Sequence, residues 1–205
     1  IRHAAESSTH VTYVFSGSSR HLLSQMFSEK SRPLYHLCSL MKLERISEET
    51  YLGVLNKRAK ANWNSLISSS VINEIIALTH CHSYYVNALC RVLWKLKSKP
   101  TIPTVQKTWL QYVEDQKPWI LDDIARLSPH QKSVLSGVAY NNISEPYSME
   151  FQRITKLSAS QIKRSLEGML RDDILYKDSK DILRILDPAI ETCIRDIARL
   201  SYQGD

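Results

Sequence analysis

Residues 158–188, SASQIKRSLEGMLRDDILYKDSKDILRILDP, carry the pattern that decides the fold of the C-terminal part of the chain. Ser158 is a typical helix N-cap, and apolar residues follow it at helical spacing, which predicts a helix over 159–171. Two short apolar stretches then flank a polar turn at 178–181, and this pattern predicts a β-hairpin. Asp187-Pro188 predicts the start of a further helix, because proline is tolerated at the first helical position.

Working outward from this stretch, the sequence predicts two helices directly upstream, one after Ser128-Pro129 and one after Ser148. Three helices followed by a hairpin is the order of a winged helix-turn-helix. Helical apolar patterns also predict a bundle of earlier helices, expected at 48–61, 70–78, 83–96 and from 105 onwards. The predicted fold class is therefore mainly α, with a winged helix-turn-helix at its end.

A strand is predicted at Val11–Phe15, where the residues are β-branched and aromatic and are followed by a small polar turn. A helix is predicted from Arg20 to Phe27, capped by Ser18 or Ser19. A buried strand on its own cannot satisfy its edge groups, and the neighbouring sequence supplies no partner for it. We therefore expect the rest of a sheet to lie upstream of Ile1.

The composition is that of an ordinary globular protein, with 43% apolar and 23% charged residues among 205. No stretch approaches about 18 uncharged apolar residues, so no membrane partner is expected. The 4 cysteines show no C-x-x-C spacing, which predicts reduced thiols in a cytoplasmic protein. His80-Cys81-His82 is not expected to hold a metal, because side chains two residues apart on a helix diverge.

Catalytic motifs are absent from the sequence. A Walker A loop needs G-x-x-x-x-G-K-[ST] to surround phosphates, and none of the 5 glycines is followed by lysine. No apolar strand ends in paired carboxylates that could hold magnesium, and no G-x-S-x-G, H-E-x-x-H or Cys/His dyad occurs. The chain alone is therefore expected not to hydrolyse ATP.

Residues 14–20 (VFSGSSR) and 32–35 (RPLY) resemble the end of the nucleotide-binding domain in the prokaryotic archaeal-type P-loop ATPases, which belong to the STAND branch of the AAA+ superfamily. The resemblance implies that Ser16, at the end of the strand, is the first nucleotide sensor and that Arg20 faces the terminal phosphate. These residue types suit the roles, because ligands gather at the carboxyl ends of strands and a planar guanidinium matches phosphate oxygens.

Residues 79–90 (THCHSYYVNALC) resemble the lid motif of the same family, T-x-G-H-P-Y-Y-x-Q-x-L. This match implies that His82, Ser83 and Tyr84 lie on the adenine side of the lid, although Cys81 and Ser83 stand where the family has glycine and proline. Leu186-Asp187-Pro188 resembles the L-x-D-P start of the family's last helix. The resemblance thus spans residues 10 to 197.

The resemblance implies four regions: a remnant of the nucleotide-binding core at 1–33, a helical lid at 34–100, a linker helix at 101–125 and a winged helix domain at 126–200. The chain would then be the lid and effector portion of an ATP-dependent switch. ATP and Mg would bind only in the intact parent protein, with the upstream P-loop core.

Two other functions fit the same sequence, and both depend on its charge. The net charge of +6 divides into +7 over residues 1–100 and −1 over residues 101–205. A winged-helix regulator would bind duplex DNA, and the residues placed for it are Gln161, Lys163 and Arg164 in the predicted recognition helix and Lys180 in the wing. Residues 148–180 carry only +2, which predicts weak phosphate binding. A protein-interaction module would instead dock its basic half on an acidic partner or associate with itself.

Overall fold

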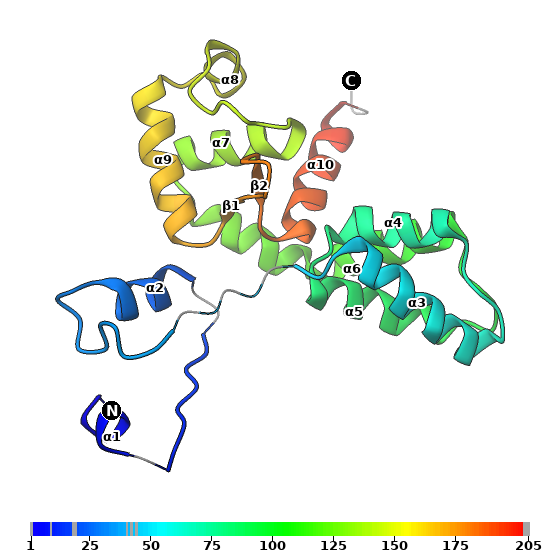
Figure 1. Cartoon of the computed structure of the whole chain (residues 1–205). Coiled ribbons are helices and arrows are strands. Elements are labelled where there is room, and N and C mark those ends of the chain that lie inside the picture. Colours follow the sequence, from blue (N-terminus) through cyan, green and yellow to red (C-terminus); the bar gives the residue numbers. More distant parts are fainter. Residues whose placement is uncertain are drawn as a thin grey trace.

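The structure is a computed structural model that describes the backbone of residues 2–8, 10–17, 20–39, 41, 43 and 45–202. Side chains are described for the same residues except Arg20, His21 and residues 197–202. The chain is mainly α (Figure 1). The helices are α1 (Arg2–Ser7), α2 (Arg20–Ser28), α3 (Glu48–Trp63), α4 (Ser69–Thr79), α5 (Ser83–Leu93), α6 (Ile102–Ala125), α7 (Pro129–Tyr140), α8 (Met149–Thr155), α9 (Ala159–Arg171) and α10 (Pro188–Tyr202), and the strands are β1 (Leu175–Lys177) and β2 (Leu183–Ile185).

Helices α3, α4, α5 and α6 form a bundle around the first hydrophobic core. α3 buries every fourth residue (Tyr51, Leu55 and Ala59), which is the spacing of one helix face. Trp109 of α6 is fully buried in this core. Its indole Nε1 donates to Thr192 Oγ1 of α10 at 3.0 Å, so the polar end of a large apolar side chain is satisfied.

Helix α6 is 24 residues long and reaches from the first core to the second. Val105, Trp109 and Val113 are buried in the first core, and Ile124 packs against both. Pro118 lies inside the helix and removes one backbone donor, yet the helix continues to Ala125. The helix expected over 101–125 is therefore present as one element.

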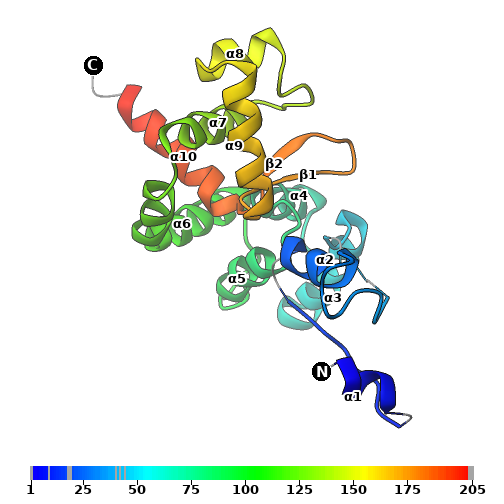
Figure 2. The same cartoon turned by 90° about the vertical axis from the view of Figure 1, so that its left-hand side faces the viewer.

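Helices α7, α8 and α9 and the hairpin β1–β2 surround the second core, and we call these elements the C-terminal unit. Ser128 and Ser158 begin α7 and α9 with capping boxes, in which the serine and the glutamine three residues later satisfy each other's backbone amides. β1 and β2 are antiparallel, with Leu175 opposite Ile185. Figure 2 shows α9 and the hairpin side by side on one face of this unit.

Helix α10 packs on both cores. Ala189 and Cys193 are buried in the first core, while Ile194 packs against the second and Ile190 against both. Its contacts reach α4 and α6 on one side and α7 and β2 on the other. Helix α10 therefore joins the bundle and the C-terminal unit. Its removal would expose apolar surface on both cores.

The predicted buried strand at Val11–Phe15 is wrong in this structure. The segment is extended but belongs to no ladder, and Val11 and Val14 are 55% and 88% exposed. A strand needs neighbours for its N–H and C=O groups, and within the described residues the sheet is the two-stranded hairpin alone. The described residues of the first core begin at Tyr51 and those of the second at Val134, so the segment belongs to neither core.

The predicted helices are confirmed, with small differences at their ends. Ser47, Ser148 and Ser158 cap the helices that follow them, each accepting a hydrogen bond from a backbone amide three residues on. α5 ends at Leu93 rather than at 96, because the chain continues from there in turns. The proposed cap of α2 by Ser18 or Ser19 lies outside the described residues.

Two helical glycines give a matched test of this packing. A methyl group on Gly137 would lie 2.8 Å from a ring carbon of Phe151 and 3.2 Å from Thr155 Cγ2, whereas one on Gly53 would meet nothing within 4 Å. We expect Gly137→Ala to lower the free energy of unfolding by about 1–3 kcal/mol through overpacking. Gly53→Ala should raise it by about 0.5–1 kcal/mol, because alanine favours the helix. Urea unfolding of the two variants measures both effects, and equal shifts of the same sign would contradict the packing of α7 on α8.

Candidate functional site

The corner between α4 and α5 carries the residues predicted for the lid motif. His80 and Cys81 both adopt left-handed backbone conformations, with φ of 48° and 56°. Thr79 closes α4 through a hydrogen bond from its hydroxyl to the Ile75 carbonyl at 2.6 Å. The chain reverses here and enters α5 at Ser83, so the predicted helix start is confirmed although glycine is absent.

Tyr85 connects this corner to the start of α10. Its hydroxyl donates to Asp187 Oδ2 at 2.5 Å. The other carboxylate oxygen of Asp187 caps α10 by accepting from the amides of Ala189 at 2.7 Å and Ile190 at 3.3 Å. Burial of Tyr85, together with its bond to Asp187, raises the pKa of the phenol far above its usual value. One carboxylate thus fixes α5 and the first turn of α10 together.

Arg45 makes a second connection, from the segment before α3. Its guanidinium donates to the carbonyl oxygens of His80, in the corner, and of Leu186, at the start of α10; the second distance is 2.8 Å. The same group lies 4.8 Å from the ring centroid of Tyr176 on β1. A single side chain therefore holds three segments that are far apart in sequence.

A partly buried acid–base cluster lies beside these two connections. His80 Nδ1 is 3.6 Å from Glu191 Oε2, and Glu191 Oε1 accepts from Arg195 at 2.6 Å. Burial, with the nearby charges of Arg45 and Arg195, lowers the pKa of His80 to about 4. The imidazole is therefore neutral at neutral pH. Burial also raises the pKa of Glu191, an effect that Arg195 opposes.

Two buried polar atoms at the corner have no hydrogen-bond partner among the described residues, Tyr51 Oη and His82 Nδ1. Both groups lie within the electrostatic reach of Arg45, which acts on the pKa of each. Burial lowers the pKa of His82, so its imidazole keeps an unprotonated nitrogen. Ser83 and Tyr84 are exposed beside it, and Tyr84 accepts a hydrogen bond from Tyr112 at 3.4 Å. The structure therefore brings His82, Ser83 and Tyr84 together at one corner.

The predicted sensor residues lie in a separate part of the molecule. Ser16 is exposed on the extended segment, where a cleft of about 590 Å³ is lined by residues 14–17 and by Leu22, Leu23, Met26 and Phe27 of α2. Phe15 packs on Phe27 with ring centroids 5.4 Å apart, which holds the segment against α2. Arg20 begins α2, and its side chain lies outside those described.

The nucleic-acid candidates lie on α9 and the hairpin. The side-chain oxygen Oε1 of Gln161 is occupied by the capping box, where it accepts from the Ser158 amide at 2.9 Å. Lys163 is 4.0 Å from Glu167 on the same helix, and both side chains are exposed. Arg164 and Lys180 are exposed as well, and neither forms an ion pair with a described residue.

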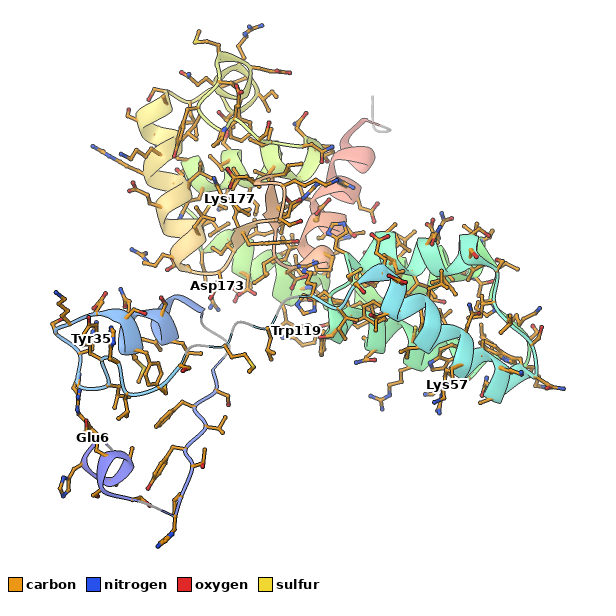
Figure 3. The ribbon with its side chains drawn as sticks, in the orientation of Figure 1. Glu6, Tyr35, Lys57, Trp119, Asp173 and Lys177 are labelled. Atoms are coloured by element: carbon orange, nitrogen blue, oxygen red, sulfur yellow. The ribbon has the colours of Figure 1, made fainter. Side chains whose placement is uncertain are left out.

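The wing, which is the turn between β1 and β2, is held together by hydrogen bonds and ion pairs to its own aspartates. Asp178 Oδ1 accepts from the amides of Lys180 and Ile182, and its Oδ2 accepts from Arg184 at 3.1 Å. These bonds outweigh the effect of burial and lower the pKa of Asp178. Lys177, labelled in Figure 3, pairs with Asp181 at 2.8 Å. Lys177 and Arg184 at the wing are therefore paired with acids, whereas Lys180 has no acidic partner among the described residues.

Sequence reasoning misses Arg45 and Glu191. Arg45 precedes α3 in a segment without periodicity, and Glu191 looks like an ordinary first-turn acid of α10. Only Asp187 carries a sequence signal, through its place before Pro188. The pairing of these residues with the corner depends on contacts over 35 to 141 positions, which no local pattern encodes.

This chain is similar in fold to a solved structure of an archaeal ATPase. The Walker-type ATPase PABY2304 of Pyrococcus abyssi matches with a TM-score of 0.59 and 20% sequence identity, over 87% of this chain and 51% of that chain. The chain thus spans about half the length of that ATPase. No protein-family model and no curated protein matches. The predicted relation to Walker-type ATPases is therefore confirmed as a likeness of fold.

No three His, Cys, Asp or Glu side chains in the described part of the chain converge where a metal ion could bind. None of the described helices is long and apolar enough to cross a bilayer.

The low pKa of His80 predicts a pH dependence of stability. As the pH falls from 7 to 5.5, the unfolded chain protonates at this position but the folded protein does not, so the free energy of unfolding should fall by about 1 kcal/mol from His80 alone. His80→Asn keeps a residue that tolerates a left-handed backbone and removes the titration. Urea unfolding across this pH range should give a flatter profile for the variant, and parallel profiles would show that His80 titrates normally in the folded protein.

Proposed function

We propose that this chain is the lid and effector portion of an ATP-dependent switch of the STAND/AAA+ type, completed by an upstream P-loop half. ATP and Mg would be held mainly by that half, because this sequence contains no Walker A loop. Support for the proposal comes from the fold likeness to a Walker-type ATPase, 51% of which is covered by the match to this chain.

The single observation that carries the proposal is the construction of the α4–α5 corner. Tyr51 Oη and His82 Nδ1 are buried there without a hydrogen-bond partner among the described residues, a costly state that a polar ligand edge would relieve. Adenine offers both a donor and acceptors along its edge. The same corner is tied by Arg45 and by Tyr85–Asp187 to the start of α10. Binding of a ligand at the corner would therefore alter the position of α10 and, with it, of the C-terminal unit.

The extended segment before α2 fits the same proposal. Its apolar side chains are exposed and its backbone has no ladder, as expected of a strand whose neighbours lie in another part of a longer protein. Added to a parallel sheet, the segment would bring Ser16 to the carboxyl end of the strand and Arg20 to the start of the following helix. These two residues are proposed to sense the terminal phosphate.

The C-terminal unit is proposed to be a winged helix that changes position when the nucleotide state changes. Its helices and hairpin follow one another in that order, and α10 links it to the bundle. Nucleotide shifts such a switch only if it binds one arrangement more tightly than the other. The paired charges of the wing favour a role in packing on a partner over a role in binding phosphates.

The proposal is tested with the longer protein that includes the upstream half. We expect that protein to bind ATP and the 205-residue chain alone to show no ATPase activity. Arg20→Ala in the longer protein should lower turnover at least about tenfold, because a charge-assisted contact to the terminal phosphate is lost. Isothermal titration with ATP and a phosphate-release assay measure binding and turnover.

Arg153→Ala is the matched control, because Arg153 is an exposed arginine of α8 outside the proposed site. It should leave ATP affinity and turnover unchanged. Failure of the longer protein to bind ATP would overturn the proposed function. Equal turnover of the Arg20→Ala variant and the unaltered protein would remove Arg20 from the site while leaving the lid assignment to be judged by ATP binding.

A further inference from the structure

The bundle carries a larger excess of positive charge than the C-terminal unit, although Arg164 and Lys180 of that unit also form no ion pair with a described residue. From Tyr51 to Val113 the sequence has eight lysines and arginines and a single acid, Glu74. Glu74 lies on α4 and accepts a hydrogen bond from Gln106 of α6 at 2.8 Å. The C-terminal unit differs, because Lys163, Lys177 and Arg184 each have an acidic neighbour.

Six of these cations cluster where α3 and α5 end, and we call them the distal basic surface. They are Lys57, Lys60, Arg91, Lys95, Lys97 and Lys99. All six are exposed, and none forms an ion pair with a described residue. Figure 3 shows Lys57 on the part of α3 turned away from the C-terminal unit.

The two helix ends that carry these cations are fixed to each other. Asn62 donates to the Trp94 carbonyl and the Trp63 indole donates to the Leu96 carbonyl, both at 3.0 Å. The two tryptophan rings pack with centroids 5.0 Å apart. Lys99 reaches back to Ser65 Oγ at 3.0 Å. The cations therefore sit on a rigid platform and would lose little backbone entropy on binding.

A shallow hollow lies between the two ends. It has a volume of about 480 Å³ and is lined by residues 61–64 and 97–99. Its lining is mostly polar or cationic and contains no carboxylate. Such a surface attracts a polyanion with repeated charges more than a single acidic group.

We propose that the distal basic surface binds the phosphodiester backbone of duplex nucleic acid without reading its sequence. Duplex DNA presents one charge per about 1.7 Å of axis, and several cations on one rigid platform release several condensed counterions together. A membrane surface fits less well, because membrane-bound helices present an apolar face beside their cations. The apolar face of α3, at Tyr51, Leu55 and Ala59, is already buried in the first core.

The test compares two fourfold variants with the same net charge. The distal variant carries Lys57→Gln, Lys60→Gln, Lys95→Gln and Lys97→Gln, all at exposed residues without an ion pair to a described residue. The control variant carries Lys163→Gln, Arg164→Gln, Lys177→Gln and Lys180→Gln, which removes four charges from α9 and the wing. Urea unfolding of both variants shows whether each remains folded.

Fluorescence anisotropy with a labelled 20-base-pair DNA of arbitrary sequence, at 50 to 200 mM salt, measures the binding. The unaltered chain should bind with a salt slope of about −4 to −5, and the distal variant should bind at least about tenfold more weakly with a slope reduced by about 3 to 4. The control variant should bind within about threefold of the unaltered chain.

Four results would overturn the proposal. The first is that the unaltered chain fails to bind DNA at 50 mM salt. The second is that the control variant loses binding while the distal variant keeps it. Poly-L-glutamate would compete as well as DNA at equal charge, which would indicate an acidic protein partner. Vesicles containing 30% anionic lipid would bind more tightly than DNA, which would indicate a membrane surface.

Discussion

The burial of α10 between two hydrophobic cores is the constraint on which the rest of this structure depends. Ala189 and Cys193 fill the first core, Ile194 faces the second and Ile190 contacts both. Removing the helix would expose apolar surface on both sides at once, at a cost of about 25 cal/mol per Å². Because one rigid helix serves both cores, the bundle and the C-terminal unit cannot rearrange independently while α10 stays in place.

The polar contacts around α10 fix its position rather than supply most of its stability. A hydrogen bond contributes only about 0.5–1.5 kcal/mol to stability, because folding exchanges it for a hydrogen bond with water. Arg45, Tyr85 and Asp187 instead define which turn of α10 lies against the α4–α5 corner. The imidazole of His80 is neutral, so the buried carboxylate of Glu191 is paired with the half-exposed guanidinium of Arg195. These contacts therefore link the corner to the C-terminal unit through α10.

Local sequence patterns predict the elements of this fold well, and the contacts between them poorly. Serine caps and apolar periodicity are encoded within a few residues, so the starts of α3, α8 and α9 could be predicted. The segment Val11–Phe15 has the composition of a buried strand, but burial depends on neighbours that the described residues do not provide. Arg45 could not be identified because its partners lie 35 and 141 positions away.

The most direct test of the central claim is whether the two cores unfold together. All 4 tryptophans lie between residues 63 and 119, so tryptophan fluorescence reports the bundle. Hydrogen exchange of α7 and α9, measured by mass spectrometry in the same urea series, reports the C-terminal unit. If α10 joins the cores as described, both probes give one midpoint. Protection of α7 and α9 that persists after the tryptophan signal is lost would contradict the account.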